Sequence, residues 1–260
     1  MVYEGSGGYI CYEYKGGRTD DDRPGITVFG VGTEDQDNPT NEADRINGVT
    51  EFDTAAADAD SVGLHTPRSW RGRIDQYGLP REANGPLVTK CRFGLPAKDD
   101  MSLFFGIVDT TSGSQNIDSI LTYTAAGAIT SVYDNFAGFF YGSGFTNDAD
   151  QLRCVAINDG GGNKDATQAP VLIPQEIGAA SAYMNLTPEL SPTLEVEVTH
   201  DGNVDFRYNG EIVRRAIGGV NPEDNYAAVV LIQTDEAVAK SIGIDFFRAE
   251  WQRYYGPVVP

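Results

Sequence analysis

Residues 191–217, SPTLEVEVTHDGNVDFRYNGEIVRRAI, decide the fold of this chain. Between 194 and 208 the apolar side chains fall at every second position on either side of one turn, and charged side chains lie between them. This period of two is typical of a β-strand that buries one face. Two turn dipeptides, Asp201-Gly202 and Asn209-Gly210, divide the stretch, so we expect three antiparallel strands.

The second dipeptide predicts a tight hairpin. Asn-Gly is the pair that best tolerates positive φ at both central positions of a type I′ turn. A two-residue loop at Asn209-Gly210 sets Phe206 opposite Val213, which places one apolar side chain opposite another.

The first dipeptide needs a longer loop. A two-residue loop there would set the two apolar faces against each other. A three-residue loop, 200–202, restores the match, pairs Val196 with Phe206 and Val198 with Val204, and leaves Gly202 in the left-handed conformation. The three strands then present one apolar face, which requires a second layer to cover it.

The rest of the chain can supply that second layer. It has 260 residues, 40% of them hydrophobic, and its 30 Gly, 13 Pro, 13 Tyr and 12 Phe favour strands and turns. We expect an all-β, two-layer antiparallel β-sandwich of the jelly-roll type, as one domain over 24–253. Further strands are predicted at 25–31, 49–53, 61–65, 87–95, 101–109, 137–141, 152–157, 226–234 and 240–251.

Three details of this prediction are specific enough to test. We expect the strands at 49–53 and 61–65 to pair with each other. Residues 110–135 are small and polar and predict a wandering connection with one short strand. In 240–251, strict alternation places Phe246 and Phe247 on opposite faces, whereas 101–109 is apolar on both faces and indicates a central strand.

The charge of the chain excludes some partners. There are 38 acidic and 19 basic residues, a formal net charge of −19 at pH 7. Such a surface repels phosphate backbones and anionic lipids, so we expect neither nucleic acid nor a membrane as partner. The first ten residues hold no signal-peptide pattern, and no apolar run approaches the roughly 18 residues of a membrane span. We expect folding in a cytoplasm.

Aromatic and arginine side chains in three segments are candidate partner contacts, because Tyr, Trp and Arg are enriched at protein interfaces. The segments are an extended N-terminal arm over 1–23 with at most one edge strand, the irregular stretch 66–86, and a C-terminal tail over 254–260. The alternative for 66–86 is a loop packed on its own sandwich. The candidate contacts are Tyr3, Tyr9, Tyr12, Tyr14, Trp70, Arg71, Arg73, Tyr254 and Tyr255.

Little in the sequence indicates a cofactor. The cysteines, Cys11, Cys91 and Cys154, form no CxxC pair, and the chain has two histidines, so we expect no metal centre. The one alternative is calcium in the polar loop 32–47, at Asp35 and Asp37 with Asn38 and Asn41. That loop lacks the EF-hand spacing and its glycine, which favours a solvated loop.

The order of the apolar runs along the chain resembles that of a known protein family. The runs FFGIVDT, AGFFY, LRCVAIND, TLEVEVTHDGNVDFRYNGEIV, YAAVVLIQT and KSIGIDFFRAEW follow one another between Leu87 and Trp251. In this order they resemble the concanavalin A-like lectin/glucanase (LamG-like) jelly roll, and more narrowly the version found in tailed-phage virion proteins. The resemblance implies a capsid decoration protein or another attached structural protein.

Glucanases of this fold carry Glu-x-Asp-x-x-Glu along one strand, because retaining hydrolysis needs two carboxyl groups about 5 Å apart. The nearest strings here, 42–47 and 51–56, each lack the last glutamate. Glu195 and Glu197 share a strand face, but it is the wet face of the hairpin. We therefore expect no enzyme activity, and a glycoside hydrolase is the least favoured function.

Two functions remain in competition. The leading hypothesis is a non-enzymatic structural virion protein of a tailed bacteriophage, assembled in the host cytoplasm and bound to a major capsid protein, a tail component or further copies of itself. The alternative is a lectin-like carbohydrate-binding module that holds a surface glycan against Tyr or Trp, with calcium organised by an Asp/Asn loop.

Overall fold

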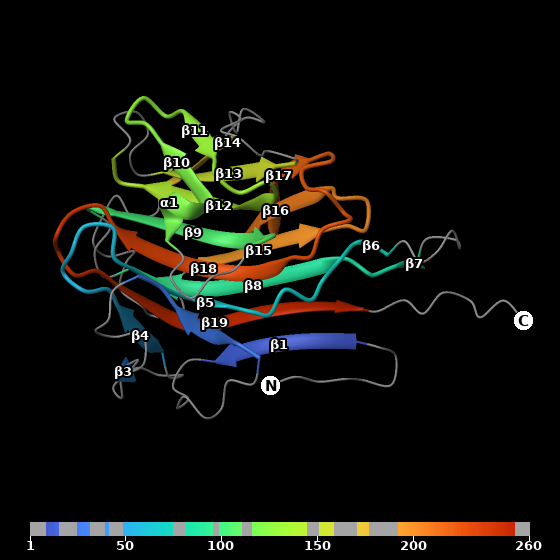
Figure 1. Ribbon diagram of the computed structural model, residues 1–260, viewed down its shortest axis with the longest axis horizontal. Helices are drawn as coiled ribbons and strands as arrows, with labels where there is room; N and C mark the ends of the chain where they lie inside the picture. Colours follow the sequence, from blue (N-terminus) through green and yellow to red (C-terminus); the bar gives the residue numbers. More distant parts are fainter. Residues whose placement is uncertain are drawn as a thin grey trace, which may run out of the picture.

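Two antiparallel β-sheets lie face to face and enclose the main core (Figure 1). The computed structural model describes residues 9–15, 25–31, 40–41, 49–74, 82–95, 99–110, 116–144, 151–158, 171–176 and 192–252. In this part of the chain, no helix is long and apolar enough to cross a membrane. The all-β, two-layer sandwich expected from the sequence is confirmed.

Sheet A has eight strands. They are β1 (Tyr9–Lys15), β3 (Thr40–Asn41), β4 (Thr50–Asp53), β8 (Leu87–Gly94), β15 (Thr193–Val198), β16 (Val204–Tyr208), β17 (Glu211–Ala216) and β19 (Ser241–Gln252). Their order in space is β17-β16-β15-β8-β19-β4-β3, and β1 also pairs with β19.

Sheet B has seven strands. They are β2 (Thr27–Phe29), β5 (Ser61–His65), β9 (Met101–Val108), β12 (Phe136–Gly142), β13 (Gln151–Ile157), β14 (Val171–Glu176) and β18 (Ala227–Thr234), in the order β14-β13-β12-β9-β18-β5-β2. Every residue of β9 is buried, which confirms the central strand predicted at 101–109. Across the core, the rings of Phe139 in sheet B and Phe206 in sheet A meet edge to face at 5.6 Å.

The two hairpins of the 191–217 stretch form as predicted, with one difference. Asn209 and Gly210 have φ of 50° and 86°, and Val196 pairs with Phe206 across the first hairpin, where Gly202 has φ of 78°. A β-bulge after Phe206 sets it opposite Arg214 and not opposite Val213, so that expected pair was wrong. The extra residue still leaves Val213 packed against the core.

The strands β4 and β5 lie in different sheets, so the prediction that they pair with each other was wrong. β4 pairs with β19 in sheet A, and β5 pairs with β18 in sheet B. Each strand has buried positions. The connection 54–60 therefore crosses from one layer to the other, which lets both strands line the same core.

A second β-bulge changes which side chains of β19 face inward. The register shifts between Ile244 and Phe246. Because the bulge inserts one residue, Ile242 and Ile244 before it and Phe247 after it all join the main core. The predicted opposition of Phe246 and Phe247 holds. Strict alternation would also set Phe247, Ala249 and Trp251 on the face opposite Ile242 and Ile244, but all five residues line the same core. Phe246 is instead half-buried on the outer face.

Residues 116–135 form more structure than the one short strand that the sequence predicts for 110–135. They fold into α1 (Ile117–Ile120) and a hairpin of β10 (Leu121–Tyr123) and β11 (Ile129–Ser131). Asn116 caps α1, accepting a 3.0 Å hydrogen bond from the Ser119 backbone. Apolar side chains of this segment pack on the outer face of sheet B and form a second hydrophobic cluster; they are Ile117, Ile120, Leu121 and Ile129, against Phe104, Phe136, Phe140 and neighbours.

The one edge strand allowed for the N-terminal arm forms, as β1. β1 lies within the predicted arm 1–23, yet it pairs with β19 over seven residues, from Tyr9 opposite Gln252 to Lys15 opposite Phe246. The sandwich therefore includes residues 9–15. A short hairpin of β6 (Arg73–Ile74) and β7 (Glu82–Ala83) lies within the irregular stretch 66–86.

Candidate functional site

The predicted contact aromatics of β1 divide between two faces. Tyr14 is 1% exposed and joins the main core, so its expected role as a partner contact was wrong. Tyr12 is half-buried and packs its ring 5.7 Å from that of Trp251. Tyr9 lies on the outer side and accepts a 3.1 Å hydrogen bond from Arg248. The candidates Tyr3, Tyr254 and Tyr255 lie outside the described residues.

The predicted Arg/Trp contact surface is also partly internal. Trp70 is fully buried, its indole N–H donates to the Gly85 carbonyl at 3.0 Å, and its ring lies 5.8 Å from that of Tyr226. It therefore ties residues 70 and 85 to the sandwich and cannot contact a partner. Arg71 is half-buried, and the side chain of Arg73 lies outside the described residues.

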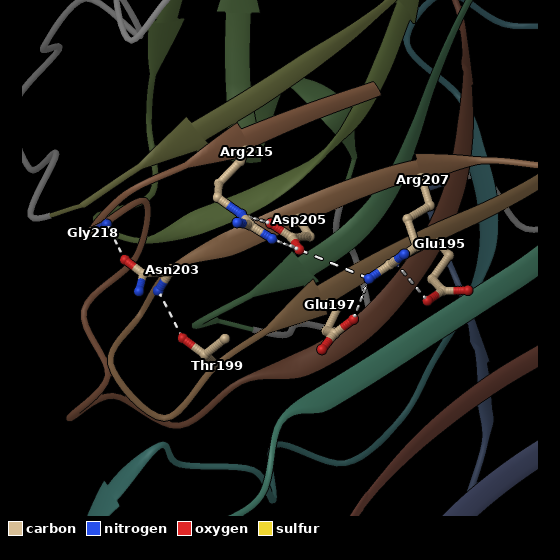
Figure 2. Close-up of polar contacts among 8 residues, drawn as sticks. All are labelled: Glu195, Glu197, Thr199, Asn203, Asp205, Arg207, Arg215 and Gly218. Atoms are coloured by element: carbon tan, nitrogen blue, oxygen red, sulfur yellow. Dashed lines mark hydrogen bonds and ion pairs between the residues drawn. The ribbon is translucent and has the colours of Figure 1, made fainter. Parts of the chain in front are cut away.

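The outer face of β15, β16 and β17 carries a ladder of ion pairs (Figure 2). Arg207 lies between two carboxylates, with Nε 3.3 Å from Glu195 and Nη2 3.0 Å from Glu197. Arg215 forms a fork on Asp205 with hydrogen bonds of 2.5 and 2.6 Å, and this hydrogen bonding lowers the pKa of Asp205. The cations separate Glu197 from Asp205, which are directly opposite in register. These acids hold the sheet together.

The tip of the first hairpin is fixed by backbone contacts, which Figure 2 also shows. The Asn203 backbone N–H donates to Thr199 Oγ1 at 3.2 Å, and Asn203 Oδ1 accepts from the Gly218 backbone at 2.9 Å. The loop that carries His200 is therefore anchored to the far end of β17. His200 itself pairs with Asp201 at 3.2 Å.

At one end of sheet B, two carboxylates share an amide. Asp109 follows β9, Asn135 precedes β12 and Asp224 precedes β18, so the ladder β12-β9-β18 brings them together. Asn135 Nδ2 donates to Asp224 at 2.6 Å, and its backbone N–H donates to Asp109 at 3.1 Å. Burial raises the pKa of Asp109, and the charge of Asp224 raises it further. We call these three residues the loop cluster.

The loop cluster offers oxygen atoms, the ligand type that calcium takes. Within the described ranges, however, no group of three or more acidic, histidine or cysteine side chains is placed to hold a metal ion. The calcium loop considered at Asp35 and Asp37 lies outside the described residues. Sequence reasoning missed the loop cluster, although Asp109 and Asn135 directly flank strongly apolar runs and Asp224 lies two residues before another.

A second polar cluster, at the other end of sheet B, holds the β10–β11 hairpin. Asp235 accepts hydrogen bonds from Tyr123 at 3.0 Å, from Ser143 at 3.1 Å and from Ser102 at 3.1 Å. Burial raises the pKa of Asp235 and raises that of Tyr123 to about 12. With three hydroxyl donors satisfied by one carboxylate, this cluster acts as a structural clasp.

We compared the chain with known proteins in three ways. No protein-family model matches the chain, and no curated protein matches it. Among solved structures, peanut lectin is similar with a TM-score of 0.54 and 10% identity, over 95% of this chain and 99% of that one. The potassium-bound carbohydrate recognition domain of Emp46p gives 0.53 and 10%, over 94% and 98%. A prokaryotic β-1,3-1,4-glucanase from a mouse hindgut metagenome gives 0.52 and 10%, over 94% and 99%.

The fold is the concanavalin A-like jelly roll. At 10% identity the likeness concerns the fold alone, and both lectins and glucanases share this jelly roll. Its function here must therefore be argued from the surfaces of this chain.

Proposed function

We propose that this protein is a non-enzymatic structural component of a tailed-phage virion, in the manner of a capsid decoration protein. The observation that most supports this proposal is the pairing of Tyr9 with Gln252. It places the points from which residues 1–8 and 253–260 depart side by side at one end of sheet A. Two segments that hold the contact candidates Tyr3, Tyr254 and Tyr255 can then serve a single attachment region on a rigid sandwich.

A non-catalytic role is supported by the state of the outer acids. Glu195 and Glu197, the alternating carboxylates that invite comparison with a glycosidase pair, are both engaged by Arg207. A general acid or nucleophile must be free to meet substrate. The virion setting is motivated by the resemblance of the apolar runs over Leu87–Trp251 to the jelly rolls of tailed-phage virion proteins. The expected partners are a major capsid protein or a tail component and further copies of this chain.

The test is incorporation into particles. Residues 1–8 and 253–260 are deleted separately and together, and β1 is kept because it pairs with β19 and buries Tyr14. Mass spectrometry of purified particles should find the full chain and lose the double deletion. Val238→Ser, at a 48% exposed position that precedes β19 and so lies at the opposite end of that strand from Gln252, serves as the control that still incorporates. Absence of the full chain from particles, or normal incorporation of the double deletion, would refute the proposal.

The loop cluster favours a second function, lectin-like glycan binding with a calcium ion. Asp109, Asn135 and Asp224 converge from three strand ends, and burial with like charge raises the pKa of Asp109. A cation there would relieve the repulsion between the two carboxylates. Glycan-array binding that is lost with a chelator and with Asp224→Asn would support this function. Binding unaffected by either change would exclude the loop cluster.

A further inference from the structure

A shallow groove crosses the outer face of sheet A over β1, β8 and β19. The groove is open to solvent and has a volume of about 410 Å³, which is within the range of small-ligand sites. We call it the β19 groove, and it is lined by Glu13, Lys15, Lys90, Arg92, Asp245, Phe246 and Arg248. Four of these side chains are basic and two acidic, whereas the whole chain has 19 basic and 38 acidic residues. The groove therefore reverses the charge balance of the molecule.

The cationic ends of the ion pairs in this groove are more exposed than the carboxylates. Lys15 lies 3.3 Å from Glu13, and their side chains are 55% and 21% exposed. Lys90 lies 2.9 Å from Glu195, with 37% and 13% exposed. Arg248 pairs through Nη2 with Glu250, with 36% and 18% exposed, and its Nη1 lies 4.0 Å from Glu13. Because Lys has three N–H donors and Arg five, donors remain after each pairing. An arriving ligand meets these donors first.

The β-bulge of β19 builds the floor of the groove. It turns both Asp245 and Phe246 toward the groove, although they are adjacent in sequence. The Arg92 guanidinium is held between them, since it pairs with the Asp245 carboxylate and lies 5.4 Å from the centre of the Phe246 ring. The floor is therefore fixed in position and partly aromatic.

The two central strands beneath the groove, β8 and β19, are paired along both edges, whereas β1 at the margin pairs with β19 alone among the described strands. β19 pairs with β1 on one side, through residues 246–252, and with β8 on the other, through residues 243–250. A peptide that adds to a sheet needs such an edge for main-chain hydrogen bonds. Over β8 and β19 the groove offers only side-chain donors and one ring, which suits a compact ligand rich in acceptor oxygens.

We propose that the β19 groove binds a carboxylated saccharide, of the class of a uronic acid unit in an acidic glycan. The carboxylate accepts hydrogen bonds from Arg248 and Lys15, a pairing that guanidinium geometry favours. Ring hydroxyls accept from Lys90, and the apolar side of the sugar lies against Phe246. This site is separate from the loop cluster, and it stands whether or not the protein is a virion component.

The test is calorimetric binding of trigalacturonate to the full chain at low ionic strength, because salt screens these contacts. Galactotriose, which lacks the carboxylates, and a hexaglutamate peptide are measured beside it. Arg248→Gln should weaken trigalacturonate binding about tenfold, as expected for one charge-assisted contact. The double variant Lys15→Gln/Lys90→Gln alters exposed positions, so it tests the groove with little risk to folding.

The matched control is Arg215→Gln, which removes the same charge from β17 on the same face of sheet A. Its side chain is 58% exposed and lies outside the groove. Binding should stay within about twofold of wild type, because Arg215 cannot touch a ligand in the groove. The proposal is overturned if wild type does not bind trigalacturonate or if galactotriose binds equally well. Tighter binding of hexaglutamate, or an equal loss in Arg215→Gln, also overturns it.

Discussion

Replacing Gly202 with alanine should destabilise the sandwich by about 3 kcal/mol, and the reason can be separated into two parts. With φ at 78°, any L residue there occupies the left-handed region, which costs about 1–2 kcal/mol. The added methyl carbon would also lie 2.1 Å from the backbone carbonyl oxygen of Val220. Since a backbone atom cannot rotate away, the loop or the 216–222 segment must shift, at about 1–3 kcal/mol.

Gly210→Ala provides the matched control. Gly210 has φ of 86°, but a methyl group there meets nothing within 4 Å. It therefore carries the conformational cost alone, partly offset by the lower entropy of the unfolded chain, for a net loss of about 1 kcal/mol. The difference between the two variants isolates the contact with Val220.

Urea unfolding followed by circular dichroism measures this difference. If the m value is about 3 kcal/mol/M, Gly202→Ala should lower the midpoint by about 1 M and Gly210→Ala by about 0.3 M. The m values should match that of wild type, since neither change alters the surface exposed on unfolding. Equal midpoints for the two variants would show that the approach of residues 202 and 220 does not constrain the hairpin, and the reasoning would be wrong.

Three further outcomes are expected. Tyr123→Phe should cost about 1 kcal/mol by removing one donor to Asp235, and hydrogen exchange should speed up at residues 121–131 more than in the core strands. The Asp205 carboxyl has a lowered pKa, so its stabilising contribution is present above the ordinary value of 3.8 and is lost as pH falls through the lower folded value; Asp205→Asn should flatten this part of the acid unfolding curve. Trp70→Phe should cost about 2–3 kcal/mol, from the lost indole hydrogen bond and the space left behind, measured as a lower thermal midpoint.

Local signals in the sequence predicted the hairpins, because a turn and the alternation beside it involve neighbours along the chain. Asn209-Gly210 and the three-residue loop ending at Gly202 appear as expected. The bulges at Val213 and Asp245 were not predicted. Near each bulge two apolar residues are adjacent, Ile212-Val213 and Phe246-Phe247, so the alternation breaks, but packing against the opposite sheet decides which residue is left out of register.

The candidate sites were less accessible to prediction. Asn135 is 26 residues from Asp109 and 89 from Asp224, so their contact depends on which strand ends are neighbours in sheet B. Aromatic and arginine side chains were assigned to a partner surface on residue type alone, yet Trp70 and Tyr14 are among the largest fully buried side chains. Aromatic side chains are enriched at protein interfaces, but they are also common in protein cores, so residue type alone does not separate the two locations.

The place of β19 in sheet A bears on how the chain acquires its structure during synthesis. β1 pairs with β19 alone among the strands of the structure, and β4 pairs with β19 and the two-residue β3. A ribosome makes both early strands well before residues 241–252, so until then they lack their main partner, and such distant pairing slows folding. A nascent chain stalled before residue 241 would therefore expose apolar edges, which makes it a substrate for chaperones and proteases and leaves it unable to act as a smaller version of the protein.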